Sequence, residues 1–399
     1  MRSLFAISAT ATHSATHSAS SAGLRPLLLP ATNHLWLVAF LLAALPLLAA
    51  DSRTPEQRVS PLFTPPQEFA GQFGNYRSPL LFNDGSRVKT AADWPRRRAE
   101  ILAQWHGLMG AWPPVLEKPK LEFLAQSRRE NFTQHRVRVE LAPGQSGEAW
   151  LLIPDGKGPF PAVLVPFYEP DTSIGLGQNP GRDFAAQLTR KGFVSLSIGS
   201  PGGDARKPDP GREVWQPLSF LGYIGANCWH ALANLPQVDS KRIGVAGHSY
   251  GGKWAMFASC FYDKFAAAAW SDPGIVFDEP RGNVNYWEPW YLGRDPQVTR
   301  KPGLIRADSP RTGAYKRMME TGRDLHEVHA LMAPRPFLVS AGSEDPPSRW
   351  VPLNHTIAVN RLLGVTNRVA MTNRKEHSPN AESNAQLIAF FEHFLKPAK

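Results

Sequence analysis

The sequence lacks the features that indicate a metalloprotein or a cofactor-dependent enzyme. It contains only two cysteines among 399 residues, and no Cys/His pair has the spacing of a zinc site. It has no His-Glu-x-x-His segment and no glycine-rich phosphate-binding loop. These absences predict that the chain uses neither a metal nor a cofactor, so its chemistry must come from side chains and backbone groups.

The sequence also has no apolar run of the length that crosses a membrane. The most apolar segment covers residues 35–50, contains Pro46 and is followed by polar residues from Asp51, whereas a spanning helix needs about 20 apolar residues. A short apolar run that ends in Leu-Ala-Ala is typical of a secretory signal. We interpret residues 1–50 as a signal peptide and N-terminal extension cleaved near Ala50. We therefore expect a secreted or periplasmic protein without stable membrane insertion.

The two cysteines leave two alternatives. An exported chain can keep a disulfide, and Cys228 and Cys260 lie in segments that we predict to be neighbouring helices. Alternatively, both are buried thiols that pack as small apolar groups. The spacing of cysteines in a sequence does not show whether their Cα atoms are close enough to bridge.

Acidic residues are fewer than basic ones, which gives a net charge of +10 and an isoelectric point near 9.7. The basic residues do not form runs with interleaved aromatics, and no nucleic-acid-binding motif is present. This argues against a nucleic-acid partner. We interpret the excess charge as suited to acidic surroundings such as an anionic polysaccharide.

From about residue 131 the chain alternates between short apolar strands and helical segments. Residues 134–141 and 149–154 predict an antiparallel hairpin, because side-chain polarity alternates around a glycine-containing turn. Six further apolar strands separated by helices predict a mostly parallel sheet. We therefore expect an α/β-hydrolase fold with an eight-stranded sheet flanked by helices. The six parallel strands are predicted at 161–167, 193–199, 242–247, 265–270, 335–340 and 368–371.

Two segments fall outside this alternation. Residues 51–130 are predicted to form an arm and an amphipathic helix that pack on the core, and residues 131–399 to form the catalytic domain. Residues 272–323 interrupt the pattern with Pro, Gly, Asn and Trp, which predicts an insertion between strands six and seven. Long insertions in compact domains usually serve a function, so we expect this one to cover the site.

A nucleophile elbow is the strongest chemical signal. Residues 247–251 read Gly-His-Ser-Tyr-Gly, directly after a predicted strand and before a helix-compatible segment. In this context Gly-x-Ser-x-Gly forms a tight turn that lifts the serine hydroxyl above the sheet. Glycines are needed because side chains would clash in the turn. Ser249 is therefore the predicted nucleophile.

The nucleophile needs a base, because a serine hydroxyl reacts poorly until its proton is taken. In this fold the order along the chain is serine, acid, histidine. His377 follows the last strand and precedes the final helix, so it is the predicted base. We expect the acid in the Gly-x-x-Asp turn after the seventh strand, which selects Asp345, with Glu344 as the alternative. The acid holds the imidazole tautomer and stabilises the imidazolium.

An oxyanion hole should complete the machinery with two backbone N–H donors. One donor is predicted to be Tyr250, the residue after the nucleophile. The other should come from the loop after the third strand, where Phe167 and Tyr168 are the alternatives.

Three motifs, at residues 90–101, 247–254 and 333–339, resemble the bacterial acetyl xylan esterase and glucuronoyl esterase branch of the α/β-hydrolases, which has a dienelactone-hydrolase-like core. The resemblance covers roughly residues 85–397 and implies a serine esterase. In glucuronoyl esterases a lysine four residues after the nucleophile contacts sugar hydroxyls, and Lys253 holds that place. Those enzymes typically carry an arginine after the serine, whose guanidinium would help to stabilise the oxyanion. Tyr250 replaces it here, so the resemblance implies the esterase class without that side-chain donor.

Aromatic residues in the insertion suggest where a sugar would bind. Trp287 and Trp290 lie in the segment Asn-Tyr-Trp-Glu-Pro-Trp-Tyr. Indole faces stack on sugar rings while their edges find polar partners. We therefore predict that both tryptophans contact the substrate.

Together these features predict a serine carboxylic-ester hydrolase, with a carbohydrate esterase as the lead hypothesis. Such an enzyme would remove acyl or uronate ester groups from plant or algal polysaccharide through an acyl-enzyme. A prolyl-oligopeptidase-like peptidase is one alternative, although residues 51–130 are too short for its propeller and show no blade repeat. A catalytically dead carbohydrate-binding homologue is another, and the complete Ser, Asp and His set argues against it.

Overall fold

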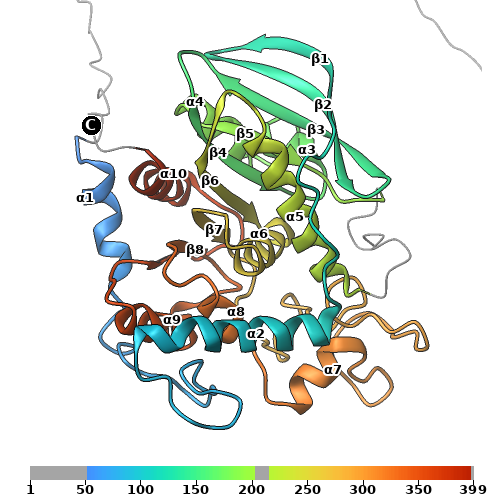
Figure 1. The fold of residues 1–399 in the computed structure, drawn as a ribbon, viewed down its shortest axis with the longest axis vertical. Helices are drawn as coiled ribbons and strands as arrows, with labels where there is room; N and C mark the ends of the chain where they lie inside the picture. Colours follow the sequence, from blue (N-terminus) through green and yellow to red (C-terminus); the bar gives the residue numbers. More distant parts are fainter. Residues whose placement is uncertain (1–51, 203–214, 397–399) are drawn as a thin grey trace, which may run out of the picture. The chain divides into compact units, whose positions relative to one another are not determined.

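The computed structural model describes residues 52–202 and 215–396, so the predicted signal segment at 1–50 lies outside the described residues. The described part is built on one nine-stranded sheet with the order β1-β2-β3-β5-β4-β6-β7-β8-β9 (Figure 1). The strands are β1 (Leu121–Arg129), β2 (Phe132–Ala142), β3 (Gln145–Pro154), β4 (Phe160–Pro166), β5 (Val194–Ile198), β6 (Val238–His248), β7 (Ala267–Ser271), β8 (Phe337–Ala341) and β9 (Val369–Asn373).

The strand directions confirm the predicted fold. Strand β2 is antiparallel to both β1 and β3, and β3 is antiparallel to β5. The remaining six strands, β5, β4, β6, β7, β8 and β9, all run parallel to one another. The α/β-hydrolase prediction is therefore confirmed, but the predicted number of strands was one too few. The missed strand is β1, which lies at the sheet edge and is largely exposed on both faces, so it lacks the alternation that identifies a half-buried strand.

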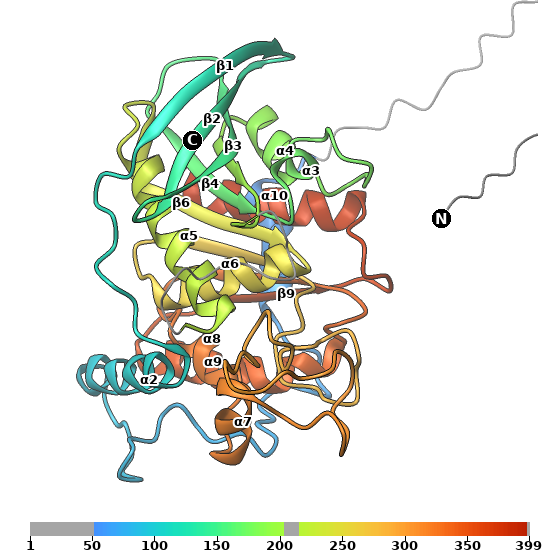
Figure 2. The same ribbon diagram turned by 90° about the vertical axis from the view of Figure 1, so that its right-hand side faces the viewer.

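Helices cover both faces of the parallel strands, and the side chains of β4 show how. Ala162 and Leu164 pack in one apolar cluster with residues of α5 and α6, whereas Val163 and Val165 pack in a second cluster with residues of α4 and α10. Because successive strand residues face opposite sides, the sheet forms the middle of three layers (Figure 2). The helices are α1 (Pro55–Val59), α2 (Trp94–Met109), α3 (Pro170–Ser173), α4 (Phe184–Arg190), α5 (Pro217–Ala233), α6 (Tyr250–Phe261), α7 (Gly313–Glu320), α8 (His326–Ala330), α9 (Trp350–Leu362) and α10 (Ala381–Leu395), with short 3₁₀ segments at Ser60–Phe63, Ala91–Asp93 and Pro347–Arg349.

The segment at 272–323 connects β7 to β8, where the insertion was predicted. It contains the helix α7 and is otherwise irregular. Tyr286, Leu292 and Tyr315 are buried and belong to the larger apolar cluster. The insertion therefore packs on the body of the protein through its own apolar side chains.

Neither cysteine forms a disulfide in this structure. Cys228 in α5 and Cys260 in α6 are buried free thiols, as the second alternative proposed, and burial raises the pKa of both. Among residues 52–202 and 215–396, no helix has the length and hydropathy needed to cross a membrane.

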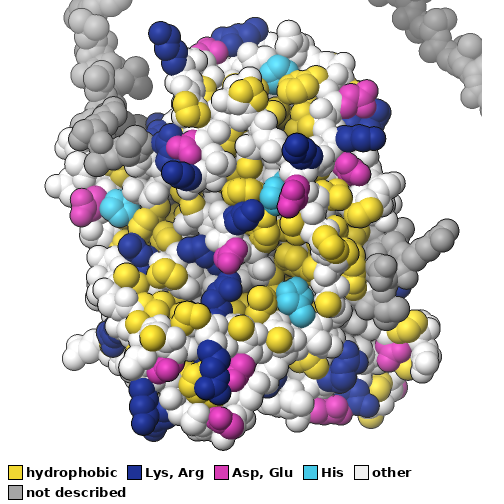
Figure 3. Space-filling view, in the orientation of Figure 1, with side chains coloured by type: hydrophobic (Ala, Val, Ile, Leu, Met, Phe, Trp, Pro, Cys, Tyr) yellow, Lys and Arg dark blue, Asp and Glu magenta, His cyan; other side chains and the backbone are white. Residues whose placement is uncertain are grey.

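The surface carries its charges in a mixed pattern. On the face in Figure 3, basic side chains lie among acidic and apolar ones. Several basic side chains are also paired on the exposed strands β1–β3, for example Arg136 with Glu148 and Arg138 with Glu122. Exposed pairs of this kind contribute little to stability.

Candidate active site

Ser249 lies in the tight turn between β6 and α6. Its backbone has φ +55°, a strained conformation for a residue with a side chain, and its N–H donates to the Ser271 carbonyl at 2.8 Å. A Cβ atom at Gly247 would overlap the Gly251 carbonyl, and one at Gly251 would overlap the Pro166 carbonyl at the end of β4. The two glycines therefore allow β4, β6 and α6 to meet closely beneath the serine.

His377 contacts the serine from the loop between β9 and α10. The distance between its Nε2 and the Ser249 Oγ is 2.9 Å, so the imidazole can accept the hydroxyl proton. The loop is held by the buried guanidinium of Arg374, which donates to the carbonyls of His377 and Ser378 and, at 2.7 Å, to that of Ser340 in β8. Arg374 thereby ties the histidine loop to the sheet.

Asp272 is the carboxylate that contacts the histidine. Its Oδ2 lies 2.7 Å from Nδ1 of His377, and its side chain is fully buried. Its Oδ1 accepts backbone N–H groups of the loop after β8, from Gly342 at 2.6 Å and from Asp345 at 3.0 Å. These bonds satisfy the buried charge, and the bond to Nδ1 leaves Nε2 as the acceptor facing Ser249.

The prediction that Asp345 is the partner of His377 is therefore wrong. Asp345 accepts the N–H groups of Gly274 at 2.8 Å and Ile275 at 2.7 Å, so its carboxylate is turned toward the loop after β7. Burial, together with the charge of Asp272, raises the pKa of Asp345 to about 6. The predicted turn after β8 is present. Its backbone N–H groups bond Asp272, whereas the Asp345 carboxylate bonds the loop after β7.

A sequence signal for Asp272 existed. It is the first residue after β7, and the carboxyl ends of parallel strands meet at the edge where sites form. The sequence interpretation places this residue at the start of the insertion at 272–323.

Glu344, the alternative acid, does not contact the histidine either. Its Oε1 accepts from the Asn283 amide at 3.3 Å, and its Oε2 lies 3.9 Å from the Arg281 guanidinium. Glu344 is nearly fully buried and borders the cavity above the serine. Its position suits contact with a bound molecule rather than orientation of the imidazole.

The candidates for the oxyanion hole divide into two groups. Tyr250 opens α6, so its amide belongs to a helix N-terminus, where N–H groups point outward. The Phe167 N–H instead donates to the Ile198 carbonyl in β5 at 3.0 Å, so the prediction that it binds the oxyanion is wrong. Tyr168 borders the cavity and stays a candidate.

A cavity of about 350 Å³ lies over the serine. The Ser249 and His377 side chains line it together with mostly polar neighbours, which offer both donors and acceptors. The lining residues are Tyr168, Ser249, Lys253, Asp272, Asn283, Asn285, Tyr291, Ser343, Glu344 and His377.

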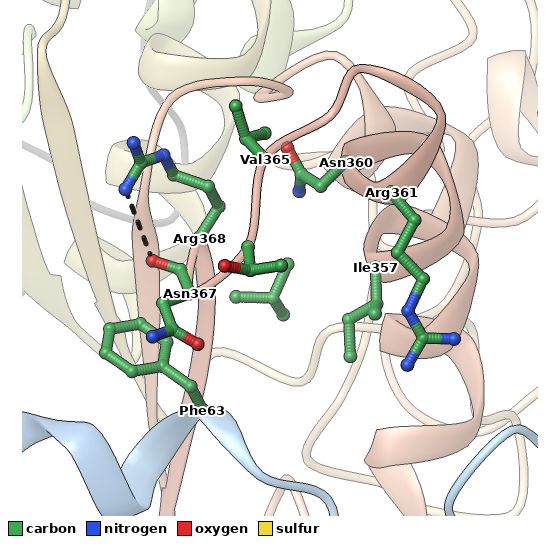
Figure 4. Close-up of a pocket in the computed structure, with 9 residues that line it drawn as sticks. Phe63, Ile357, Asn360, Arg361, Val365, Asn367 and Arg368 are labelled. Atoms are coloured by element: carbon green, nitrogen blue, oxygen red, sulfur yellow. Dashed lines mark hydrogen bonds between the residues drawn. The ribbon is translucent and has the colours of Figure 1, made fainter.

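A second cavity, of about 150 Å³, lies between α9 and the start of β9 (Figure 4). Arg361 and Arg368 lie on different sides of it, and Phe63 forms part of its wall. It contains no serine–histidine pair, so the hydrolytic chemistry belongs to the larger cavity.

Lys253 lines the larger cavity from the first turn of α6. Its Nζ donates to the Pro273 carbonyl and lies 5.0 Å and 5.4 Å from the ring centroids of Tyr286 and Tyr291. Burial lowers the pKa of Lys253 to about 8, although neighbouring carboxylates, with Asp345 first, partly offset this. The ammonium therefore loses its proton in an accessible pH range.

The two tryptophans of the insertion differ in their surroundings. Trp287 is fully buried, and its Nε1–H donates to the Gly303 carbonyl at 2.8 Å, so the prediction that it contacts substrate is wrong. Trp290 is half-buried beside Tyr291 and is not among the residues that line the cavity. Its contact with substrate stays a prediction.

Replacing Trp287 by alanine should destabilise the folded protein by about 3–5 kcal/mol, the usual cost of truncating a buried tryptophan. The reason is that the indole fills the interior of the insertion and satisfies a backbone carbonyl. Urea unfolding followed by circular dichroism measures this cost. A variant of wild-type stability with a raised KM only on a glycan ester would contradict the assignment to the core.

The sheet topology and the hydrogen bonds among Ser249, His377 and Asp272 define the chain as an α/β-hydrolase. Its serine–histidine–aspartate triad lies at the carboxyl edge of the sheet. No family model matches the sequence. A 4-O-methyl-glucuronoyl methylesterase from Podospora anserina is 22% identical over 355 residues, which are 79% of this chain and 67% of the relative.

Solved structures with the same fold include three esterases. A glucuronoyl esterase from Solibacter usitatus superposes with a TM-score of 0.62 at 18% identity, over 80% of this chain and 97% of the other. A promiscuous CE15 esterase from the marine bacterial metagenome gives the same values. A putative acetyl xylan esterase from Bacteroides fragilis gives a TM-score of 0.51 at 14% identity, over 77% of this chain and 83% of the other.

Proposed function

We propose that the chain is a serine esterase that hydrolyses carbohydrate esters through an acyl-enzyme. The observation that carries this proposal is the continuous hydrogen-bonded line from Ser249 through His377 to the buried Asp272, all of which line an open polar cavity. This arrangement activates a hydroxyl for attack on a carbonyl carbon.

The geometry supports a two-stage reaction. The Ser249 Oγ attacks the ester carbonyl while its proton passes to Nε2 of His377, and the imidazolium is stabilised by Asp272. The imidazolium then gives the proton to the departing alcohol, which leaves the acyl group on the serine. A water molecule, deprotonated by the same imidazole, hydrolyses the acyl-enzyme and regenerates Ser249.

The lining of the cavity favours a sugar over an apolar alcohol. Lys253 and Asn283 supply donors, and Glu344 has one buried carboxylate oxygen without a hydrogen-bond partner among the described residues. Hydroxyl groups can satisfy both kinds of group. Relatives named for methyl glucuronate and xylan esters support the same substrate class, and uronate or acetyl esters are the two members to be tested.

The alternatives fit less well. A peptidase of the prolyl-oligopeptidase type would carry a propeller of β-blades, whereas residues 52–120, all described, form helices and loops with no β-strand. A catalytically inactive carbohydrate-binding homologue would not need the 2.9 Å contact between the Ser249 Oγ and Nε2 of His377. We also propose that the enzyme is exported, because residues 35–50 have the pattern of a secretory signal.

The test is a panel of esters combined with active-site labelling. The purified protein should react with a fluorophosphonate probe at Ser249 and hydrolyse 4-nitrophenyl acetate. It should also hydrolyse acetylated xylan or the methyl ester of glucuronate. Labelling without hydrolysis of any ester would reject the esterase proposal, and cleavage of a prolyl peptide substrate alone would support the peptidase.

The charge of Lys253 should control substrate affinity in alkaline solution. Because its pKa is about 8, the ammonium becomes a neutral amine as pH rises through that value, and its hydrogen bonds to substrate oxygens weaken. We expect KM for the glycan ester to rise several-fold between about pH 7 and 9 in the wild type. In Lys253→Met, KM should be high at both pH values, and a parallel rise in both proteins would reject this role.

A further inference from the structure

The sheet order places the histidine and the β4 loop on opposite sides of the nucleophile. Strand β6, which carries Ser249, lies between β4 and β7. His377 and Asp272 follow β9 and β7 on one side. Tyr168, which follows β4, approaches from the other side and lines the same cavity. In this fold the second oxyanion donor comes from that β4 side.

The Tyr168 side chain is held firmly at this position. Its ring stacks on the ring of Tyr250 with centroids 4.7 Å apart and planes 9° from parallel, and it meets the ring of Phe167 edge-on. The Tyr168 carbonyl accepts the Ser200 N–H at 3.0 Å, and the Tyr250 hydroxyl lies 2.7 Å from the Ser200 Oγ. The phenol is therefore oriented before substrate binds.

The Tyr168 side chain also faces the same cavity as the nucleophile. Tyr168 is 38% exposed, and it lines the cavity together with Ser249 and His377. Of the two backbone N–H groups expected here, that of Phe167 already donates to the Ile198 carbonyl, which leaves the Tyr168 amide as the alternative to the phenol. A preorganised hydroxyl beside the nucleophile is a group that can stabilise developing negative charge.

We propose that the Tyr168 hydroxyl donates a hydrogen bond to the oxyanion, alongside the amide of Tyr250. This inference rests on the proposed acyl transfer at Ser249 and replaces the backbone donor expected in the β4 loop by a side chain. Burial raises the pKa of Tyr168, so its proton is retained at neutral pH and the group acts as a donor.

The Tyr168 phenol transfers no proton during the attack of Ser249 on the ester. The bond between Ser249 Oγ and the carbonyl carbon forms, the carbonyl π electrons move to oxygen, and the serine proton goes to His377. Tyr168 keeps its proton and shares it with the oxyanion. When the intermediate collapses, the carbonyl reforms, the bond to the leaving oxygen breaks, and His377 protonates that oxygen.

Tyr168→Phe tests this role because it removes the hydroxyl and retains the stacked ring. We expect kcat on 4-nitrophenyl acetate to fall about 100-fold, the usual loss of one oxyanion donor, with KM within about twofold of wild type. Phosphonylation of Ser249 by a fluorophosphonate should slow by at least about tenfold, because the phosphoryl oxygen takes the place of the oxyanion.

The matched control is Tyr223→Phe, which removes a tyrosine hydroxyl that donates to the Pro114 carbonyl outside the site. It should match wild type in kcat and in phosphonylation rate. In crystals of the phosphonylated wild type, the Tyr168 Oη should lie about 3 Å from the phosphoryl oxygen. A separation too long for a hydrogen bond would overturn the proposal.

The outcomes separate this inference from the proposed function. If Tyr168→Phe is phosphonylated as fast as the wild type, the hydroxyl has no such role, and the Tyr168 amide becomes the second oxyanion donor. Slowed phosphonylation in a protein that hydrolyses no ester would support Tyr168 and reject the esterase proposal. A wild-type protein inert toward the probe would overturn both.

Discussion

Replacing Asp272 by asparagine should lower kcat on 4-nitrophenyl acetate by about 10⁴-fold, the loss known for the same change in a serine protease triad. Asp272 is the carboxylate bonded to Nδ1 of His377, and an amide in its place favours the wrong imidazole tautomer. Initial rates at saturating substrate measure the effect, with KM expected to change little.

The comparison variant is Asp345→Asn. Because this carboxylate bonds the amides of Gly274 and Ile275, its loss should lower the melting temperature while kcat stays within about tenfold of wild type, far above that of Asp272→Asn. Both enzymes are measured with circular dichroism as the folding control. If Asp345→Asn is the more inactive of the two, the acid is Asp345 and the contact seen at Asp272 is not the productive one.

Ser249→Ala should remove ester hydrolysis almost completely, with kcat about 10⁶-fold lower, as is typical when the nucleophile of a triad is deleted. The fold should survive, because the Ser249 N–H bond to Ser271 uses the backbone and the change deletes only an oxygen atom that lines the cavity. Hydrolysis of 4-nitrophenyl acetate and the melting curve are measured together.

The labelling experiment gives an independent check. Ser249→Ala should show no covalent adduct with a fluorophosphonate by intact-mass spectrometry, whereas the wild type should gain one. If the variant retains a tenth of the activity, or still forms an adduct, the nucleophile is a different residue.

The sequence predicted the parts of the site that depend on local signals. The elbow around Ser249 has a motif within five residues and a defined strand–turn–helix context. His377 could be found from its place after the last strand. The sheet was predicted because buried parallel strands are continuous apolar runs, and only the exposed edge strand β1 escaped this rule.

The errors concern properties that depend on distant contacts. Whether Asp272 or Asp345 meets the histidine is decided by how two loops pack on each other. Similarly, Phe167 was excluded as a donor by its bond to β5, and Trp287 by its burial in the insertion. None of these contacts lies within a few residues in sequence, so periodicity and motif spacing carry no information about them.

The two loops that contain Asp272 and Asp345 hold each other through backbone amides, and this has a consequence for the dynamics of the protein. Asp272 accepts amides from the loop that contains Asp345, and Asp345 accepts amides of Gly274 and Ile275 in the loop that begins with Asp272. Neither loop can detach without breaking the bonds of both, so they should open as one cooperative unit. In native-state hydrogen exchange, these amides should therefore share one opening free energy. Each opening event would also withdraw the carboxylate from His377, so motion at the start of the insertion would interrupt catalysis while leaving the sheet intact.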